Sequence, residues 1–176
     1  MIVSKQLEPD EKCIRCLLHP LMFSHRKGLQ NYCVLPPLNG NKVSLLRLRY
    51  AKDGLAFCFR FGKSLLVKNN EFVGLAMLTP NIVAECNAVI KNVANPVFAE
   101  IVYAPMTKGN YVDLTLDVDT DDPDIDLPMH ADLTYYNLEE GDVKTNLRMY
   151  AHELIKKVEY AFCEEDALKN WGKFEQ

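Results

Sequence analysis

Three side chains suited to proton transfer stand out, and two of them are close neighbours in the sequence. His130 and Asp132 lie two residues apart in a run of β-forming residues, so a strand would place both on one face. His19 precedes a proline near the start of the chain. Histidine titrates near neutral pH, so these groups could act as general acid and base if they line one cleft. A lone histidine beside a proline or at a strand start is more often a structural hydrogen-bonding group, and this alternative stays open.

The run 43–50 contains the groups best suited to bind an anion. Alternation along a strand places Ser44 on one face and both Arg47 and Arg49 on the other. Guanidinium groups bind phosphate and carboxylate through paired hydrogen bonds. If the protein is an enzyme, the sequence predicts Ser44, Arg47 and Arg49 as ligand-binding residues and His19, His130 and Asp132 as catalytic residues.

A cluster near the start of the chain has the residue types of a zinc site. Cys13 and Cys16 form a Cys-x-x-Cys pair, and His19 and Cys33 follow. Zinc takes four nitrogen or sulfur ligands, but the spacing matches no standard finger and no second pair exists. The alternative is a short amphipathic segment with incidental thiols, and we expect no cofactor. We expect the six cysteines to be reduced, because a chain this apolar needs no disulfides.

The run from Asp117 to Asp126 is acidic and partly matches a calcium-binding loop. Three of its aspartates fall at the first, third and fifth positions of the EF-hand loop. Asp122 stands where that loop requires glycine, and Pro128 stands where it requires a bidentate glutamate. A solvated acidic loop is the simpler interpretation, and such a loop could also contact a basic partner.

Three further sequence motifs each lack residues that their function requires. Residues 62–64 end like a phosphate-binding loop, but phenylalanine replaces the first glycine that this loop requires. His152 starts like a zinc-protease helix, but lysine replaces the second histidine. Residues 54–61 partly match an RNA-binding strand, with leucine and arginine at two ring positions. Together with a net charge of −4, this mismatch argues against nucleic acid as a partner.

Hydrophobic periodicity predicts an α+β fold with a mainly antiparallel sheet and a long C-terminal helix packed on one face. That helix is expected over 143–163, where apolar residues recur at three- and four-residue spacing. Thr79 and Pro80 have the types of a helix cap and first residue, so a second helix is expected to about residue 90. Residues 54–67 favour helix in their second half, and 164–173 predict a short helix. The expected strands are 32–35 and 43–50, paired as a hairpin, then 72–78, and a meander of 97–103, 111–116 and 130–136.

Length and composition are those of one globular domain spanning residues 1–176. Apolar residues make up 48% of the chain, which is enough for a core without metal or disulfides. The start of the chain has no apolar signal core, and no stretch reaches the roughly 18 apolar residues of a membrane span. We therefore expect a cytoplasmic protein that has no membrane partner.

Three short motifs resemble a group of small uncharacterised bacterial proteins. They are His-Pro-x-x-Phe-Ser at 19–24, Val-Ser-Leu-Leu-Arg-Leu-Arg-Tyr at 43–50 and His-Ala-Asp-Leu at 130–133. We associate such proteins with multi-gene defence or mobile-element loci. The resemblance is scattered over roughly residues 19–155 and implies no known activity. It implies a bacterial origin and a component that acts with a partner.

Because no catalytic signature keeps all its residues, the sequence favours a non-catalytic binding or adaptor protein in a multi-component bacterial system. Its acidic run and its arginines offer oppositely charged surfaces for a protein partner or for a small anionic ligand. The alternative is a hydrolase or transferase acting on a phosphorylated or nucleotide-like ligand. That alternative requires His19, His130 and the two arginines to meet in one pocket.

Overall fold

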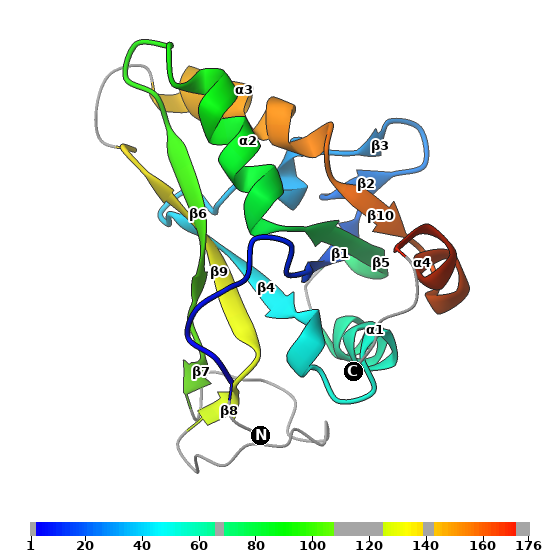
Figure 1. The fold of residues 1–176 in the computed structure, drawn as a ribbon. Coiled ribbons are helices and arrows are strands. Elements are labelled where there is room, and N and C mark those ends of the chain that lie inside the picture. Colours follow the sequence, from blue (N-terminus) through cyan, green and yellow to red (C-terminus); the bar gives the residue numbers. More distant parts are fainter. Residues whose placement is uncertain (1–2, 66–68, 108–124, 139–142, 172–176) are drawn as a thin grey trace.

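Six strands form one antiparallel sheet in the computed structural model, which describes residues 3–65, 69–107, 125–138 and 143–171 (Figure 1). The strand order is β10-β5-β1-β4-β9-β6, and two short strand pairs, β2–β3 and β7–β8, lie apart from this sheet. The sheet strands are β1 (Cys13–His19), β4 (Lys42–Arg47), β5 (Glu71–Leu78), β6 (Phe98–Tyr103), β9 (His130–Tyr136) and β10 (Glu159–Ala161). The short strands are β2 (Phe23–Ser24), β3 (Gly28–Leu29), β7 (Met106–Thr107) and β8 (Ile125–Leu127).

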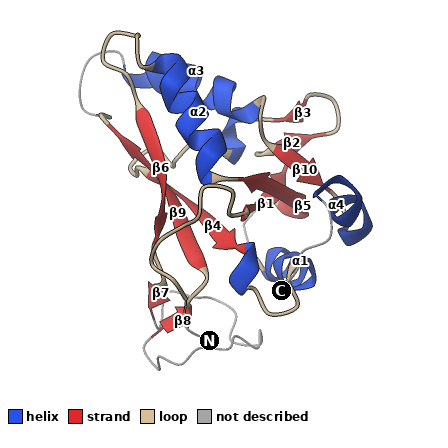
Figure 2. Ribbon diagram, in the orientation of Figure 1, coloured by secondary structure: helices blue, strands red, loops and turns tan. Residues whose placement is uncertain are grey.

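Helices pack on both faces of the sheet, and each face has its own apolar core. On one face lie α2 (Pro80–Ile90), α3 (Val143–Ile155) and the 3-10 helix η1 (Asn31–Cys33). On the other face lie α1 (Leu55–Ser64), α4 (Glu164–Trp171) and the 3-10 helix η2 (Leu48–Tyr50). Figure 2 shows the two helix pairs apart from each other, with strands of the sheet between them. Along most of β1 and β5, neighbouring residues enter different cores, as alternation requires. The expected α+β fold with a mainly antiparallel sheet is confirmed.

Several elements form where the sequence predicts them. The expected strands 72–78, 97–103 and 130–136 are β5, β6 and β9, and β6 pairs directly with β9. The hydroxyl of Thr79 caps α2, because its oxygen accepts a hydrogen bond from the Ile82 N–H at 3.3 Å. α4 is the expected short helix near the end of the chain, and α1 is helical from Leu55 onward rather than only in its second half.

The helix expected over 143–163 forms over 143–155 as α3, and its expected continuation to residue 163 is wrong. α3 ends at Ile155, the chain turns, and Glu159–Ala161 adds β10 to the edge of the sheet beside β5. Val158 belongs to the core of α2 and α3, whereas Ala161 belongs to the core of α1 and α4. These two apolar residues therefore do not lie on one face of a helix, as the predicted spacing required. Gly74 of β5 allows the close approach, since a Cβ there would lie 2.5 Å from the Ala161 carbonyl oxygen.

Three expectations about the first fifty residues are also corrected. Residues 32–35 do not pair with β4, because the Val34 and Leu35 N–H groups donate to the Asn31 carbonyl oxygen and close η1 instead. The neighbours of β4 are β1 and β9. The cysteine-containing segment, for which a short amphipathic segment was the alternative to a zinc site, is β1, an inner strand that pairs with β5 along its length and is buried on both faces. β4 ends at Arg47, and the last three residues of the expected strand form η2.

Two predictions fall largely outside the described residues. The expected strand 111–116 lies there, and so does the acidic run from Asp117 as far as residue 124. Its cation-binding alternative therefore stays a prediction. In the part of the chain that the structure describes, none of the helices has the length and apolar character needed to cross a membrane.

Candidate functional site

Alternate residues of β4, β9 and β6 form one face of the sheet, which we name the polar face. Directly opposed residues of an antiparallel pair share a face. The register sets Ser44 opposite Asp132 and Leu46 opposite His130, and Asp132 lies opposite Val102 on its other side. The polar face consists of Lys42 and Ser44 on β4, His130, Asp132, Thr134 and Tyr136 on β9, and Phe98, Glu100 and Val102 on β6.

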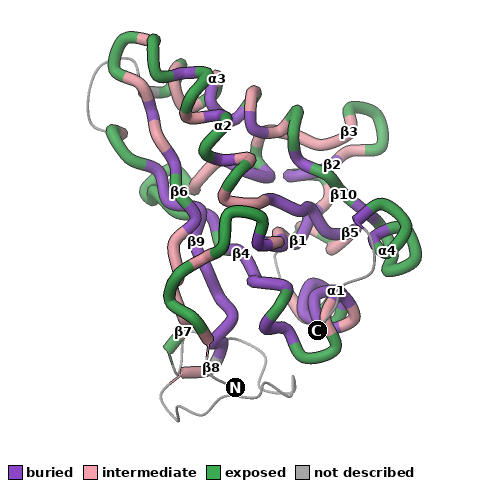
Figure 3. Tube along the Cα trace, in the orientation of Figure 1, coloured by how far each residue is buried: buried purple, intermediate pink, exposed green. Residues whose placement is uncertain are grey.

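No described helix covers the polar face. The core of α1 and α4 lies on the same side of the sheet, but it is built on β1, β5 and β10 and includes only Leu46 from β4, β9 and β6. Figure 3 shows β9 buried along most of its length, whereas β6 beside it is partly exposed. Ser44 and Glu100 are exposed, and Tyr136 is 43% exposed. Solvent therefore reaches the margins of the polar face, whereas His130, Asp132 and Thr134 along β9 are buried.

His130 and Asp132 come together on the polar face. His130 Nδ1 donates a hydrogen bond to the Ala104 carbonyl oxygen at 2.6 Å. Its Nε2 atom lies 3.9 Å from Asp132 Oδ1, and Lys42 Nζ lies 3.4 Å from Asp132 Oδ2. Nε2 is buried and has no hydrogen-bond partner among the described residues. This arrangement favours a neutral imidazole with its proton on Nδ1, and it gives Asp132 a counter-ion in Lys42.

Burial lowers the pKa of His130 below its ordinary value of 6.5, although the hydrogen bond to Ala104 and the charge of Asp132 oppose this shift. The folded chain therefore resists a proton that the unfolded chain accepts below about pH 6.5. We expect the free energy of unfolding to fall from about pH 7 to about pH 5, and to fall less steeply in His130→Gln. Urea titrations across this range measure both slopes. His152→Gln, at an exposed histidine, is the control, and equal slopes in wild type and His130→Gln would refute a buried neutral His130.

The geometry around His130 suits structure and recognition better than proton transfer. A general base must reach the proton it abstracts within hydrogen-bonding distance. One ring nitrogen of His130 is bonded to Ala104, and the other is enclosed beside Asp132. The catalytic roles of His130 and Asp132 therefore stay predictions.

An arginine that the sequence analysis did not select contacts the main chain of Ser44, although its side chain leaves β1 on the other face, opposite Ala76 of the core of α2 and α3. Nη1 of Arg15, on β1, donates a hydrogen bond to the Ser44 carbonyl oxygen at 3.0 Å. Arg15 Nε is buried without a hydrogen-bond partner. Arg15 is the one charged residue in the otherwise apolar run 13–18. Because a charge is costly to bury in a strand, this position could have been selected from the sequence. Ser44 thus has an arginine beside it, but not the one expected.

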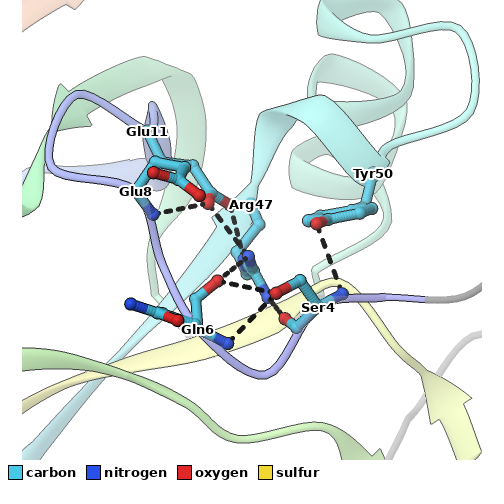
Figure 4. Close-up of polar contacts among 6 residues, drawn as sticks. All are labelled: Ser4, Gln6, Glu8, Glu11, Arg47 and Tyr50. Carbon is cyan, nitrogen blue, oxygen red and sulfur yellow. Dashed lines mark hydrogen bonds and ion pairs between the residues drawn. The ribbon is translucent and has the colours of Figure 1, made fainter.

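Arg47 lies in the interior at the end of β4, where it is ion-paired and not open to a free anion. Its Nε and Nη2 atoms donate to the two carboxylate oxygens of Glu11 at 2.5 and 2.9 Å (Figure 4). Nη1 donates to the Ser4 carbonyl oxygen and Nη2 to that of Gln6. Burial opposes the charge of Arg47, but the hydrogen bonds and charge of Glu11 outweigh it and raise the pKa. In place of the predicted ligand site, Arg47 anchors the amino-terminal segment.

Arg49 and His19 also lie away from the polar face. Arg49 is exposed in η2, and its guanidinium lies 5.4 Å from the centre of the Tyr50 ring. His19 ends β1 five residues beyond Ile14, the last β1 residue that pairs with β4, and this is roughly 17 Å along the strand. Its ring instead lies 5.3 Å from that of His25. The expected pocket shared by His19 and His130 is therefore not formed.

The residues of the candidate zinc cluster do not converge. Cys13 belongs to the core of α2 and α3 and Cys16 to the core of α1 and α4, so their side chains lie on opposite faces of β1. Burial raises the pKa of Cys13, Cys16 and Cys33 to about 12, so these thiols stay protonated. Among the described residues, no group of three or more histidine, cysteine, aspartate and glutamate side chains could hold a metal ion. These cysteines act as small apolar core residues.

A separate hollow of about 520 Å³ lies on the α1 side of the sheet. Its wall includes three phenylalanines, one from α1, one from β5 and one directly after β10, together with Lys63 and Cys163. None of the six site residues predicted from the sequence forms part of this wall. The hollow is thus distinct from the polar face.

Neither a scan against protein-family models nor searches of curated proteins and of solved structures found a match to this chain. The resemblance to small bacterial proteins stays a prediction. The function is therefore argued from the polar face and its immediate neighbours.

Proposed function

We propose that this chain is a non-catalytic binding protein that recognises a protein partner through the polar face. The observation that carries the proposal is the uneven cover of the sheet. One helix layer packs on the face made by β1, β4, β5, β6 and β9, whereas the other packs only on the half made by β1, β5 and β10. The half that contains the polar face is packed against no helix of the described residues.

The side chains of the polar face have the composition of an interaction surface. Phe98 and Tyr136 are directly opposed across β6 and β9 and supply apolar area at one end. Lys42 and Glu100 supply exposed charges of opposite sign. Protein interfaces combine aromatic anchors with polar and charged groups that give register and specificity. A partner with its own mixed-charge surface would fit this pattern.

The proposal also covers the compartment and the kind of system in which the protein acts. Five of the six cysteines are buried free thiols and the sixth is an exposed free thiol, which fits a reducing compartment such as the cytoplasm. The resemblance to small bacterial proteins supports an adaptor that works in a multi-component bacterial system. The acidic run adds a possible second contact, but it lies mostly outside the described residues.

Bulky charged substitutions on the polar face test the proposal. Ser44→Arg and Glu100→Arg change exposed side chains, so we expect them to alter the unfolding temperature little. We expect each to reduce the amount of specific partner captured from cells that naturally produce the protein by about tenfold or more. Arg148→Glu, at an exposed position on α3 on the opposite side of the sheet, is the matched control. Equal capture by all three variants and wild type would reject the polar face as the binding surface.

A hydrolase or transferase is the second candidate, and one observation favours it. His130, Asp132 and the exposed Ser44 share one face, with a histidine that is neutral near pH 7. This candidate requires Nε2 of His130 to become accessible when a ligand binds. Undiminished partner capture by His130→Gln supports the binding function, whereas product formation that this substitution abolishes supports the enzyme.

A further inference from the structure

Three aromatic rings form a patch at the β10 end of the sheet. The ring of Phe23 on β2 contacts those of Tyr160 and Phe162, with ring centres 6.0 and 4.8 Å away. The rings of Tyr160 and Phe162 also contact each other, at 5.5 Å, and these two residues are 40% and 45% exposed. β10 is one end of the strand order, whereas the polar face belongs to β4, β9 and β6 at the other end. The aromatic patch and the polar face are therefore separate surfaces.

The outer side of β10 is an open edge of the sheet. β5 is the one strand that pairs with it in the described part of the chain. Among the described residues, no others form a hydrogen bond with the backbone of 159–161. An open edge strand can pair with another chain, and folded proteins usually cover such edges. Exposed rings beside an open edge are therefore typical of an interaction surface.

The aromatic patch lies between charges of opposite sign. The turn between β2 and β3 carries Arg26 and Lys27, and His25 of the same turn contacts the ring of Phe23 at 5.7 Å. α4 begins with three carboxylates, at 164–166. Figure 1 shows the β2–β3 hairpin and α4 at the end of the molecule where β10 lies. These two cations and three carboxylates are exposed, and none of them forms an ion pair with a described residue.

We propose that this end of the molecule binds a second copy of the chain and forms a two-fold symmetric dimer. We name it the β10 surface, and it consists of Phe23, Tyr160, Phe162, Arg26, Lys27 and the acidic residues 164–166. A two-fold interface uses the same surface on both subunits, so a group on one side of the axis meets the group that lies across it. The inference goes beyond the proposed function, because the polar face is built on other strands and stays free in both copies.

Charge complementarity favours a second copy over an unrelated partner. The β10 surface carries both signs of charge in separate places, the basic turn on the hairpin and the carboxylates on α4. A two-fold rotation brings the basic turn of each copy to the carboxylates of the other, so both sets of charges gain partners. A partner of one charge sign would leave one of the two sets unpaired. The rings between them supply the apolar centre that such an interface needs, with the charges at its rim.

Sedimentation equilibrium of the purified full-length protein, from low micromolar to submillimolar concentration and at low ionic strength, tests the dimer. We expect a reversible equilibrium between monomer and dimer in the wild type. Tyr160→Lys should raise the dissociation constant about tenfold or more, because it removes an aromatic anchor and puts a charge in the centre of the interface. Val89→Lys, at a 60% exposed residue of α2, is the matched control and should leave the dissociation constant unchanged.

Charge reversal tests whether the basic turn of one copy meets α4 of the other. One variant carries Arg26→Glu with Lys27→Glu, and a second carries Glu164→Lys with Glu165→Lys. We expect each variant alone to dimerise about tenfold more weakly than the wild type, because like charges then face each other. An equimolar mixture of the two should dimerise as the wild type does, since one contact is then reversed on both sides and the other is native. These four side chains are exposed, so the mixture still decides if Tyr160→Lys fails to fold.

Three results would overturn the dimer. They are a wild type that stays monomeric over the whole concentration range, a dimer that Tyr160→Lys leaves intact, and a mixture of the charge-reversed variants that associates no better than either alone. Each of them leaves the proposed function standing, because partner capture is measured separately. Conversely, equal partner capture by Ser44→Arg and wild type would reject the polar face and leave the dimer standing.

Discussion

Arg47→Met is expected to lower the free energy of unfolding by about 3–5 kcal/mol, because it leaves the buried carboxylate of Glu11 without its partner. The side chains of Arg47 and Glu11 are 0% and 2% exposed. The same arginine also donates to the carbonyl oxygens of Ser4 and Gln6, so its loss releases the segment that leads into β1. Urea denaturation followed by circular dichroism measures the change. Arg60→Met is the matched control, because its ion pair with Asp53 is exposed and is worth at most about 1 kcal/mol.

The double substitution Glu11→Leu with Arg47→Met tests the reason for this loss. Removing both charges takes away the uncompensated ion, so we expect much of the lost stability to return. If the double variant is as unstable as Arg47→Met, then packing rather than the unpaired charge explains the effect. If Arg47→Met costs no more than Arg60→Met, the buried ion pair does not hold the amino-terminal segment.

Asn87→Ala is expected to cost about 2–4 kcal/mol, because one side chain closes the outer edge of the sheet. The Asn87 amide takes the place of a neighbouring strand beside β6. Its Nδ2 donates to the Ala99 carbonyl oxygen at 2.8 Å, and its Oδ1 accepts from the Ala99 N–H at 3.1 Å. The hydroxyl of Tyr150 also donates to Oδ1, at 3.0 Å. Loss of the amide leaves buried polar groups unpaired and an edge strand open to other chains.

The measurements for Asn87→Ala are urea denaturation and gel filtration at several protein concentrations. We expect reduced stability and a new tendency to associate, since an open edge can pair with a second copy. Asn146→Ala is the control, because its amide bonds the carbonyl oxygens of Ala94 and Asn95 at an exposed site. A loss of stability no larger than in Asn146→Ala would show that the edge does not depend on Asn87.

The sequence predicts those elements whose signals are local. α2 carries its own cap in Thr79 and its own start in Pro80, and the structure confirms both. The strands 97–103 and 130–136 are rich in β-forming residues and form as predicted, but they pair directly with each other, whereas the predicted meander placed 111–116 between them. The placement of His130 and Asp132 on one face follows from the two-residue alternation of a strand.

The sequence fails where tertiary contacts decide. Residues 143–163 keep an apolar spacing typical of a helix, but two of those residues belong to different cores, and pairing with β5 converts 159–161 into a strand. Arg47 and Arg15 are both arginines in strand segments, and nothing local distinguishes the one that Glu11 neutralises from the one that pairs with no carboxylate of the described residues. Glu11 lies 36 residues before Arg47, so its role becomes visible only when the sheet brings them together.

The position of contact with the partner is the most direct test of the polar face as the recognition surface. A photo-reactive amino acid is placed in turn at the exposed positions 44, 100 and 148 of the protein in the cells that produce it. We predict that the first two positions cross-link to the same protein and that position 148 on α3 does not. A cross-link from position 148 with a yield equal to or higher than the yields from positions 44 and 100 would contradict the assignment.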